Sequence, residues 1–374
     1  MLPLEDIKVV DFSRFLPAAY ASWICADMGA EVIRIEHPRE LAKQEAMFGK
    51  DGDPAAALRT RARPSFFRNK RSLLLNPGNA AARPVLERLI RGADVLIEDY
   101  RPGVMAKMGY GYEAMAALNP RLIYLSVSLA GQTGPLAGRA GHDPLALALA
   151  GALPRLNGLG KPSLPGLQVA DPLAGAHAIV GLLLALRARE KSGRGQQVDI
   201  AMSDASLPLQ MVSMARYDDL DDMPAPGTWN PKGGVWECAD GKYLCTTDME
   251  PAYWQRFCEA VGRPEFAALQ QDKAQHARME AELTQLFRTR PRDEWVELLG
   301  SNGIPCAPIL DPAEAFQHPQ VQALGIFQSP PDLEMPLVSA PWSINGVRPP
   351  VRRRAPSLGE DNAAVLGKGR SSPT

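Results

Sequence analysis

Three short segments contain side chains that could move protons or attack an electrophile. His142 stands in a GHD segment between a glycine-containing turn and a long apolar run, AGRAGHDPLALALAGALPRL, in a chain with only five histidines. Asp171 and Glu250 each stand directly before a proline. A histidine and a carboxylate that face each other across one carbon would supply the two bases of an inverting proton transfer.

The same residue types are also common where helices begin. An aspartate before a proline is a typical N-cap, and the pattern predicts a helix from Asp171 to Glu190 that stops at Ser192-Gly193. His142 could equally be a turn residue beside a buried helix, and Glu250 could simply begin a helix. The pattern alone leaves both the catalytic and the capping interpretations open at these positions.

The sequence lacks the motifs of several common sites. It contains no GxxxxGK[ST], GxSxG or HExxH, and its first strand-to-helix turn reads SRFLP where a dinucleotide fold would have GxGxxG. Five cysteines form no CxxC pair, and the scattered histidines predict no metal site. We therefore expect reduced thiols, no metal and no redox cofactor.

The elements that must position these residues alternate between strand and helix. Helical spacing alternates with strand-like apolar runs, which predicts a parallel sheet covered on both faces, a Rossmann-like α/β fold. The expected strands are Ile7–Phe12, Glu31–Glu36, Val95–Asp99, Leu122–Ser128 and Gln197–Met202, and the expected helices include Ala18–Met28, Ala80–Arg91 and Asp171–Glu190.

Composition divides the chain and limits its partners. We expect a large domain over 1–217, a linker rich in Asp, Pro and Gly over 218–236, a small α/β domain over 237–310, and a return segment with a loosely held tail over 311–374. The net charge of −1 favours neither nucleic acid nor an anionic membrane. The longest apolar run, near AIVGLLLALRA, is too short to span a bilayer, so we expect a cytoplasmic protein.

Several segments together resemble one family. They are DFSRFLPAAYASWICADMGAEVIRIEHP, the block from NKRSLLLNPG to LAGRAGHD, and SGRGQQVDIAMSDA, and the likeness is thinner through CADGKYLCTTDMEPAYWQRFCEAVG and GIPCAPIL. They resemble the class III CoA-transferase family (CaiB/BaiF type), which also contains the α-methylacyl-CoA racemases. The resemblance implies a large Rossmann-like domain, a smaller domain, and an interlocked-ring homodimer that binds acyl-CoA as its substrate.

The resemblance also implies roles for the three candidates. In transferases of the family, the aspartate that matches Asp171 is a nucleophile that forms an aspartyl thioester with CoA by way of mixed anhydrides. In racemases it acts as an acid and base opposite a histidine that matches His142, which a glutamate matching Glu250 supports. For the CoA phosphates the resemblance points to Arg101 in the EDYRPG turn, with Arg34, Arg68 and Lys70 as weaker candidates.

Two enzymatic hypotheses and one binding hypothesis remain. The first is α-proton transfer on an acyl-CoA of the 2-methylacyl-CoA racemase type, with His142 and Asp171 as opposed bases, because GHD and the glutamate before proline occur together. The alternative is transfer of CoA between carboxylic acids through Asp171. The third is a catalytically silent acyl-CoA-binding relative.

Overall fold

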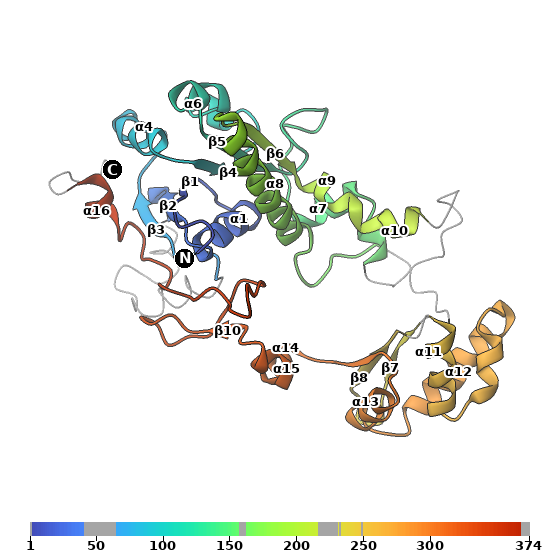
Figure 1. Ribbon diagram of the computed structural model, residues 1–374. Coiled ribbons are helices and arrows are strands. Elements are labelled where there is room, and N and C mark those ends of the chain that lie inside the picture. Colours follow the sequence, from blue (N-terminus) through green and yellow to red (C-terminus); the bar gives the residue numbers. More distant parts are fainter. Residues whose placement is uncertain are drawn as a thin grey trace. The chain divides into compact units, whose positions relative to one another are not determined.

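The computed structural model describes residues 2–40, 65–156, 162–215, 231, 233–247 and 250–367 (Figure 1). Contacts divide the chain into two compact units. The larger unit contains the described residues up to 215 and those from 325 onward, and the smaller unit contains 231–324. Most of the predicted linker, 218–236, lies outside the described residues.

The larger unit is built on a six-stranded sheet in which every pairing is parallel. The strand order is β3-β2-β1-β4-β5-β6, the doubly wound order of Rossmann-like folds, which confirms the predicted fold class. The strands are β1 (Lys8–Asp11), β2 (Glu31–Glu36), β3 (Arg71–Leu74), β4 (Val95–Glu98), β5 (Ile123–Ser128) and β6 (Gln197–Ala201).

Helices cover both faces of this sheet, as the continuous apolar strands predict. Successive residues of a strand point to opposite faces of the sheet, so Val9 belongs to the hydrophobic cluster on one face and Val10 to the cluster on the other. On the first face lie α1 (Leu16–Asp27), α7 (Asp143–Leu149), α8 (Ala170–Ser192) and α9 (Met202–Ser206), with α10 (Met211–Met214) after them. On the second face lie α4 (Arg83–Arg91), α5 (Val104–Lys107), α6 (Tyr112–Leu118) and α16 (Asn362–Leu366).

Helix α8 is the longest element and packs directly on α1. A Cβ built at Gly175 would lie 2.6 Å from the Cβ of Tyr20 and 2.8 Å from the carbonyl oxygen of Pro17. Only glycine permits this approach, which brings the first turn of α8 beside the start of α1. By length and composition α8 could cross a membrane, but Ala174, Ala178 and other residues of one face are buried in the core of the larger unit.

The smaller unit is an α/β module with an antiparallel sheet in the order β7-β8-β9. Stacked aromatic rings of Trp254, Phe257 and Phe287 form part of its core. Its elements are β7 (Gly234–Glu237), β8 (Tyr243–Thr246), β9 (Cys306–Ile309), α11 (Pro251–Ala260), α12 (His276–Phe287), α13 (Arg292–Ser301), α14 (Pro312–Gln317) and α15 (Pro319–Ala323).

The chain returns to the larger unit at residue 325, whereas the sequence analysis began the return segment at 311. The reason is an ion pair. Arg292 donates to both carboxylate oxygens of Glu314, at 2.9 and 3.1 Å, which ties α14 to the smaller unit. The returning segment then forms a short hairpin of β10 (Phe327–Gln328) and β11 (Leu337–Val338).

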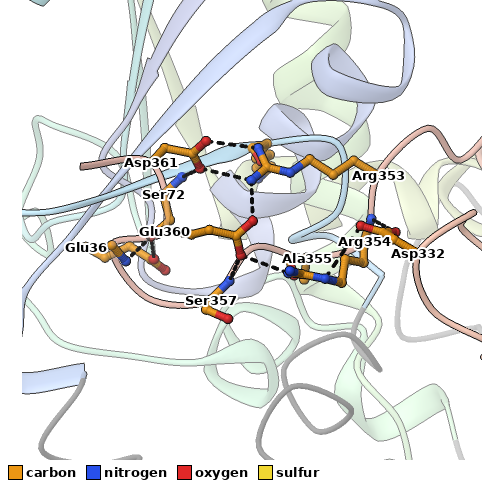
Figure 2. A network of polar contacts seen from close by, with 11 residues as sticks. Glu36, Ser72, Asp332, Arg353, Arg354, Ala355, Ser357, Glu360 and Asp361 are labelled. Carbon is orange, nitrogen blue, oxygen red and sulfur yellow. Dashed lines mark hydrogen bonds and ion pairs between the residues drawn. The ribbon is translucent and has the colours of Figure 1, made fainter. Parts of the chain in front are cut away.

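The tail is held more firmly than the sequence predicted. Arg353 pairs with Asp361 at 3.1 Å and with Glu360 at 2.6 Å, and Arg354 also pairs with Glu360 (Figure 2). Asp361 accepts a hydrogen bond from the backbone amide of Ser72 on β3. The expectation of a loosely held end is therefore wrong up to residue 367, because Arg353 and Arg354 of VRRRAP pair with carboxylates that follow them. Residues 368–374 lie outside the described residues.

Candidate functional site

A cavity of about 490 Å³ opens in the larger unit at the carboxyl ends of the parallel strands. The segments that follow β1, β4 and β5 line it, so it lies at the position between β1 and β4 where the strand order reverses. Ligands of doubly wound sheets bind at this position. Asp171, His142 and Arg101, which the sequence analysis selected, all line this cavity.

The sequence predicted Asp171 as the N-cap of this helix, but the observed N-cap is Val169, and Asp171 is the second residue of α8. Within the described residues its carboxylate makes no hydrogen bond or ion pair, so it does not cap the helix. Burial raises the pKa of Asp171 to about 6, the negative charge of Asp143 adds to this, and His142 opposes it. At neutral pH this side chain is an ionised, unpaired carboxylate that faces the cavity beside a helix N-terminus.

His142 and Asp143 precede and begin α7. The His142 side chain is exposed, makes no capping hydrogen bond and meets the ring of Phe15 edge-on at 5.7 Å between centroids. Asp143 is buried, and one of its oxygens accepts hydrogen bonds from the backbone amides of Val169 and Asp171. The third letter of the GHD motif therefore contacts the candidate nucleophile, a role that the sequence analysis missed.

The turn after β1 is occupied by a carboxylate of the protein itself. Asp99 accepts hydrogen bonds from the backbone amides of Arg14 and Phe15, at 2.9 and 2.7 Å, and its side chain is 5% exposed. Burial raises the pKa of Asp99 to about 6, although these two amides and the Arg14 side chain lower it. Dinucleotide folds place a pyrophosphate at this turn. An ionised Asp99 would repel a pyrophosphate at this turn, and the absence of NAD binding stays a prediction.

Three arginines of the described chain line the cavity: Arg14, Arg101 and Arg139. Arg101 was selected from the sequence and is exposed, so it is available to an anionic ligand. The Arg14 guanidinium lies 3.9 Å from the centre of the Tyr100 ring. The sequence analysis noted the SRFLP turn that contains Arg14 but did not select Arg14 as a site residue. Its position directly after the first parallel strand is the signal that could have identified it.

The other predicted CoA ligands are placed differently. The side chains of Arg68 and Lys70 are completely buried, and they pair with Asp27 at 2.7 Å and Asp11 at 3.1 Å. Arg34 is also buried and pairs with Glu36 at 3.1 Å. None of the three lines the cavity. Arg68 and Lys70 join the segment before β3 to α1 and β1, whereas Arg34 pairs within β2.

Glu250 belongs to the smaller unit, where it is exposed and directly precedes α11. Its side chain makes no capping hydrogen bond there. Its support of His142 stays a prediction. Among the described residues no cluster of three or more His, Cys, Asp or Glu side chains is arranged to hold a metal ion.

Fold and cavity together define a Rossmann-like α/β protein, and Asp171, whose carboxylate has no partner in the part of the chain that the structure describes, lies where ligands of such sheets bind. A family model described as CoA-transferase family III matches residues 4–362. The chain is 30% identical to the acetyl-CoA:oxalate CoA-transferase of Acetobacter aceti and 31% identical to the formyl-CoA:oxalate CoA-transferase of Shigella sonnei, covering 97% of this chain and 95% of each relative. The chain therefore belongs to CoA-transferase family III.

Solved structures agree with this assignment. A CaiB/BaiF family protein from Brucella suis superposes with a TM-score of 0.80 at 27% identity, over 98% of each chain. Rv3272 from Mycobacterium tuberculosis gives a TM-score of 0.81 at 26% identity, over 98% of this chain and 99% of that one. The relatives named above are transferases, so these findings favour the alternative hypothesis over the racemase reaction that the sequence analysis ranked first.

Proposed function

We propose that this protein transfers CoA between two carboxylic acids, with Asp171 as the nucleophile. One observation above the others supports this: in the described structure the Asp171 carboxylate is unpaired and lines the cavity at the start of α8. Family membership supplies the acyl-CoA chemistry. A carboxylate that only stabilised the fold would be expected to have a hydrogen-bond or ion-pair partner.

The reaction needs four exchanges at acyl carbons. Asp171 attacks the thioester carbonyl of the donor and expels CoA thiolate, which leaves a mixed anhydride. The thiolate attacks the aspartyl carbonyl, releases the donor acid and forms an aspartyl thioester. The acceptor carboxylate then attacks this thioester and expels the thiolate again. Finally the thiolate attacks the acceptor's acyl carbonyl, which gives the new acyl-CoA and restores the Asp171 carboxylate.

The electrostatics of the cavity suit this sequence. A pKa of about 6 leaves Asp171 mostly ionised at pH 7 and makes it more basic than an ordinary aspartate. The exposed Arg101 would pair with a CoA phosphate through its planar guanidinium. No further cofactor is required, because CoA is part of the substrate.

The acyl group is expected to be small. Besides its charged residues the cavity is lined by apolar side chains, among them Phe15, Leu129 and Met202. The relatives are named for formyl-CoA, acetyl-CoA and oxalate. We therefore propose short acids of this kind as the first substrates to test.

A homodimer is part of the proposal. The larger unit exposes apolar side chains of α8, among them Val180 and Leu184, which are 54% and 65% exposed. After α9 the chain exposes more of them, including Met211 and Val212 at 63% and 60%. Exposed apolar groups in this number are typical of a protein–protein interface. A second copy of the chain would cover them.

The test is CoA exchange between acetyl-CoA or formyl-CoA and oxalate, followed by mass spectrometry of the trapped enzyme. Asp171→Asn should abolish exchange and the adduct. Glu113→Gln removes an exposed carboxylate from the first turn of α6, outside the cavity, and should leave both intact. Full exchange by Asp171→Asn would refute the proposal.

Racemisation is the second candidate, and one observation favours it: His142 and Asp171 line the same cavity. In deuterated water, opposed bases would place deuterium at the α-carbon of a 2-methylacyl-CoA without an acceptor acid. We expect no such exchange. Deuterium incorporation that His142→Ala abolishes would restore this hypothesis.

A further inference from the structure

The start of α8 is held by a carboxylate from another part of the chain. Asp143 has 3% of its surface exposed, and its Oδ2 accepts hydrogen bonds from the amides of Val169, at 2.7 Å, and Asp171, at 2.9 Å. The first amides of a helix have no partner within the helix, and the N-cap side chain usually accepts from one of them. The residue at the N-cap here is Val169, which cannot accept. Asp143 replaces the missing cap.

This contact fixes the backbone from which the Asp171 side chain projects. Because one oxygen binds the amides on both sides of Ala170, the turn cannot rotate without breaking a charge-assisted hydrogen bond. Asp143 also begins α7, directly after His142. One residue therefore joins the His142 loop to the turn that carries Asp171.

The second oxygen of Asp143 indicates that more than stability is involved. In the described structure Oδ1 is buried and has no hydrogen-bond partner. A buried carboxylate with an unsatisfied oxygen weakens folding. An asparagine could still offer its carbonyl oxygen to both amides without burying a charge, so the hydrogen bonds alone do not explain an aspartate here.

We infer that Asp143 is the positioning residue for Asp171, holding its backbone in place and setting a negative charge beside its carboxylate. This inference rests on the proposed function, in which Asp171 is the nucleophile. Among the described residues, the titratable groups that act on the Asp171 carboxylate are Asp143, His142 and Asp99. The arginines that line the cavity are Arg14, Arg101 and Arg139. Burial has the largest effect on the pKa of Asp171, and the negative charge of Asp143 has the next largest.

Two substitutions separate the two effects. Asp143→Asn keeps an oxygen for the amides and removes the charge, whereas Asp143→Ala removes both. For Asp143→Ala we expect kcat for acetyl-CoA and oxalate to fall about 10²-fold, the loss that a misplaced reacting group causes, with KM for acetyl-CoA changed less than about threefold. For Asp143→Asn we expect a smaller loss of kcat and a descending acid limb of the rate profile that moves to lower pH.

A readout that needs no turnover completes the test. With ¹³C-labelled aspartate, the Asp171 carboxyl resonance, assigned by its loss in Asp171→Asn, should titrate at lower pH in Asp143→Asn than in the wild type. Hydrogen exchange of the peptide around Val169 to Asp171 should accelerate in Asp143→Ala and stay slow in Asp143→Asn. Glu113→Gln should change neither.

The outcomes are distinguishable. An unchanged Asp171 titration in Asp143→Asn, together with unchanged hydrogen exchange in Asp143→Ala, would overturn the positioning role, whatever the enzyme's reaction. If the titration and exchange change as expected but wild-type Asp171 is never modified during turnover, the positioning role stands and the proposed function fails.

Discussion

Replacing Arg68 by methionine tests whether this residue binds a ligand or stabilises the fold. The Arg68 and Asp27 side chains are 0% and 2% exposed, and Arg68 donates to both carboxylate oxygens of Asp27, at 3.2 and 2.7 Å. Among the described side chains, Arg68→Met leaves the buried Asp27 carboxylate with the Asn69 amide, at 2.7 Å, as its remaining hydrogen-bond donor. Removing one partner of a buried pair costs about 3–5 kcal/mol of unfolding free energy.

The assay combines urea denaturation with calorimetric titration of CoA. We expect Arg68→Met to lower the free energy of unfolding by this amount and to leave the Kd for CoA within about twofold. Adding Asp27→Leu should recover much of the loss, because both charges are then absent. The control is Arg71→Met, whose pair with Glu31 is 47% and 41% exposed and contributes about 0–1 kcal/mol. Wild-type stability with CoA binding weakened more than tenfold would refute this reasoning and restore Arg68 as a ligand.

Three further predictions address the cavity and the assembly. Arg101→Ala should weaken CoA binding by about 1.5–3 kcal/mol, the contribution of a hydrogen bond to a charged group; calorimetry that shows unchanged affinity would contradict it. Because burial raises the pKa of Asp171 to about 6, its ionised form is lost as the pH falls through 6, so kcat/KM should decline below this pH; a profile flat to pH 5 would argue against an Asp171 nucleophile. Light scattering at low micromolar concentration should give a dimer, and a clean monomer would count against the proposed interface.

The parallel sheet was predictable because its signal is local. Apolar strand runs such as IKVVDF and EVIRIE are bounded by helical spacing, and both of these strands place buried residues on both faces of the sheet. The meeting of His142, Asp171 and Arg101 followed from the family resemblance, and the structure explains it: all three lie near the carboxyl edge of one sheet.

The partners of buried charges were not predictable from local patterns. Arg68 and Lys70 resembled a phosphate-binding cluster, but their carboxylates lie 41 and 59 residues away in the sequence. The bond from Asp143 to the Asp171 amide spans 28 residues. Such pairings depend on how the strands are ordered in the sheet, and no spacing rule along the chain reveals them.

The most direct measurement on the Asp171 nucleophile is peptide mass spectrometry of the wild-type enzyme quenched during turnover with acetyl-CoA and oxalate. Hydroxylamine should convert an aspartyl thioester or anhydride into a hydroxamate, and borohydride should reduce it. We predict that Asp171 is the modified residue and that omitting acyl-CoA abolishes the modification. An unmodified Asp171, combined with α-deuterium in 2-methylacyl-CoA incubated in deuterated water, would contradict the transferase mechanism and favour proton transfer between His142 and Asp171.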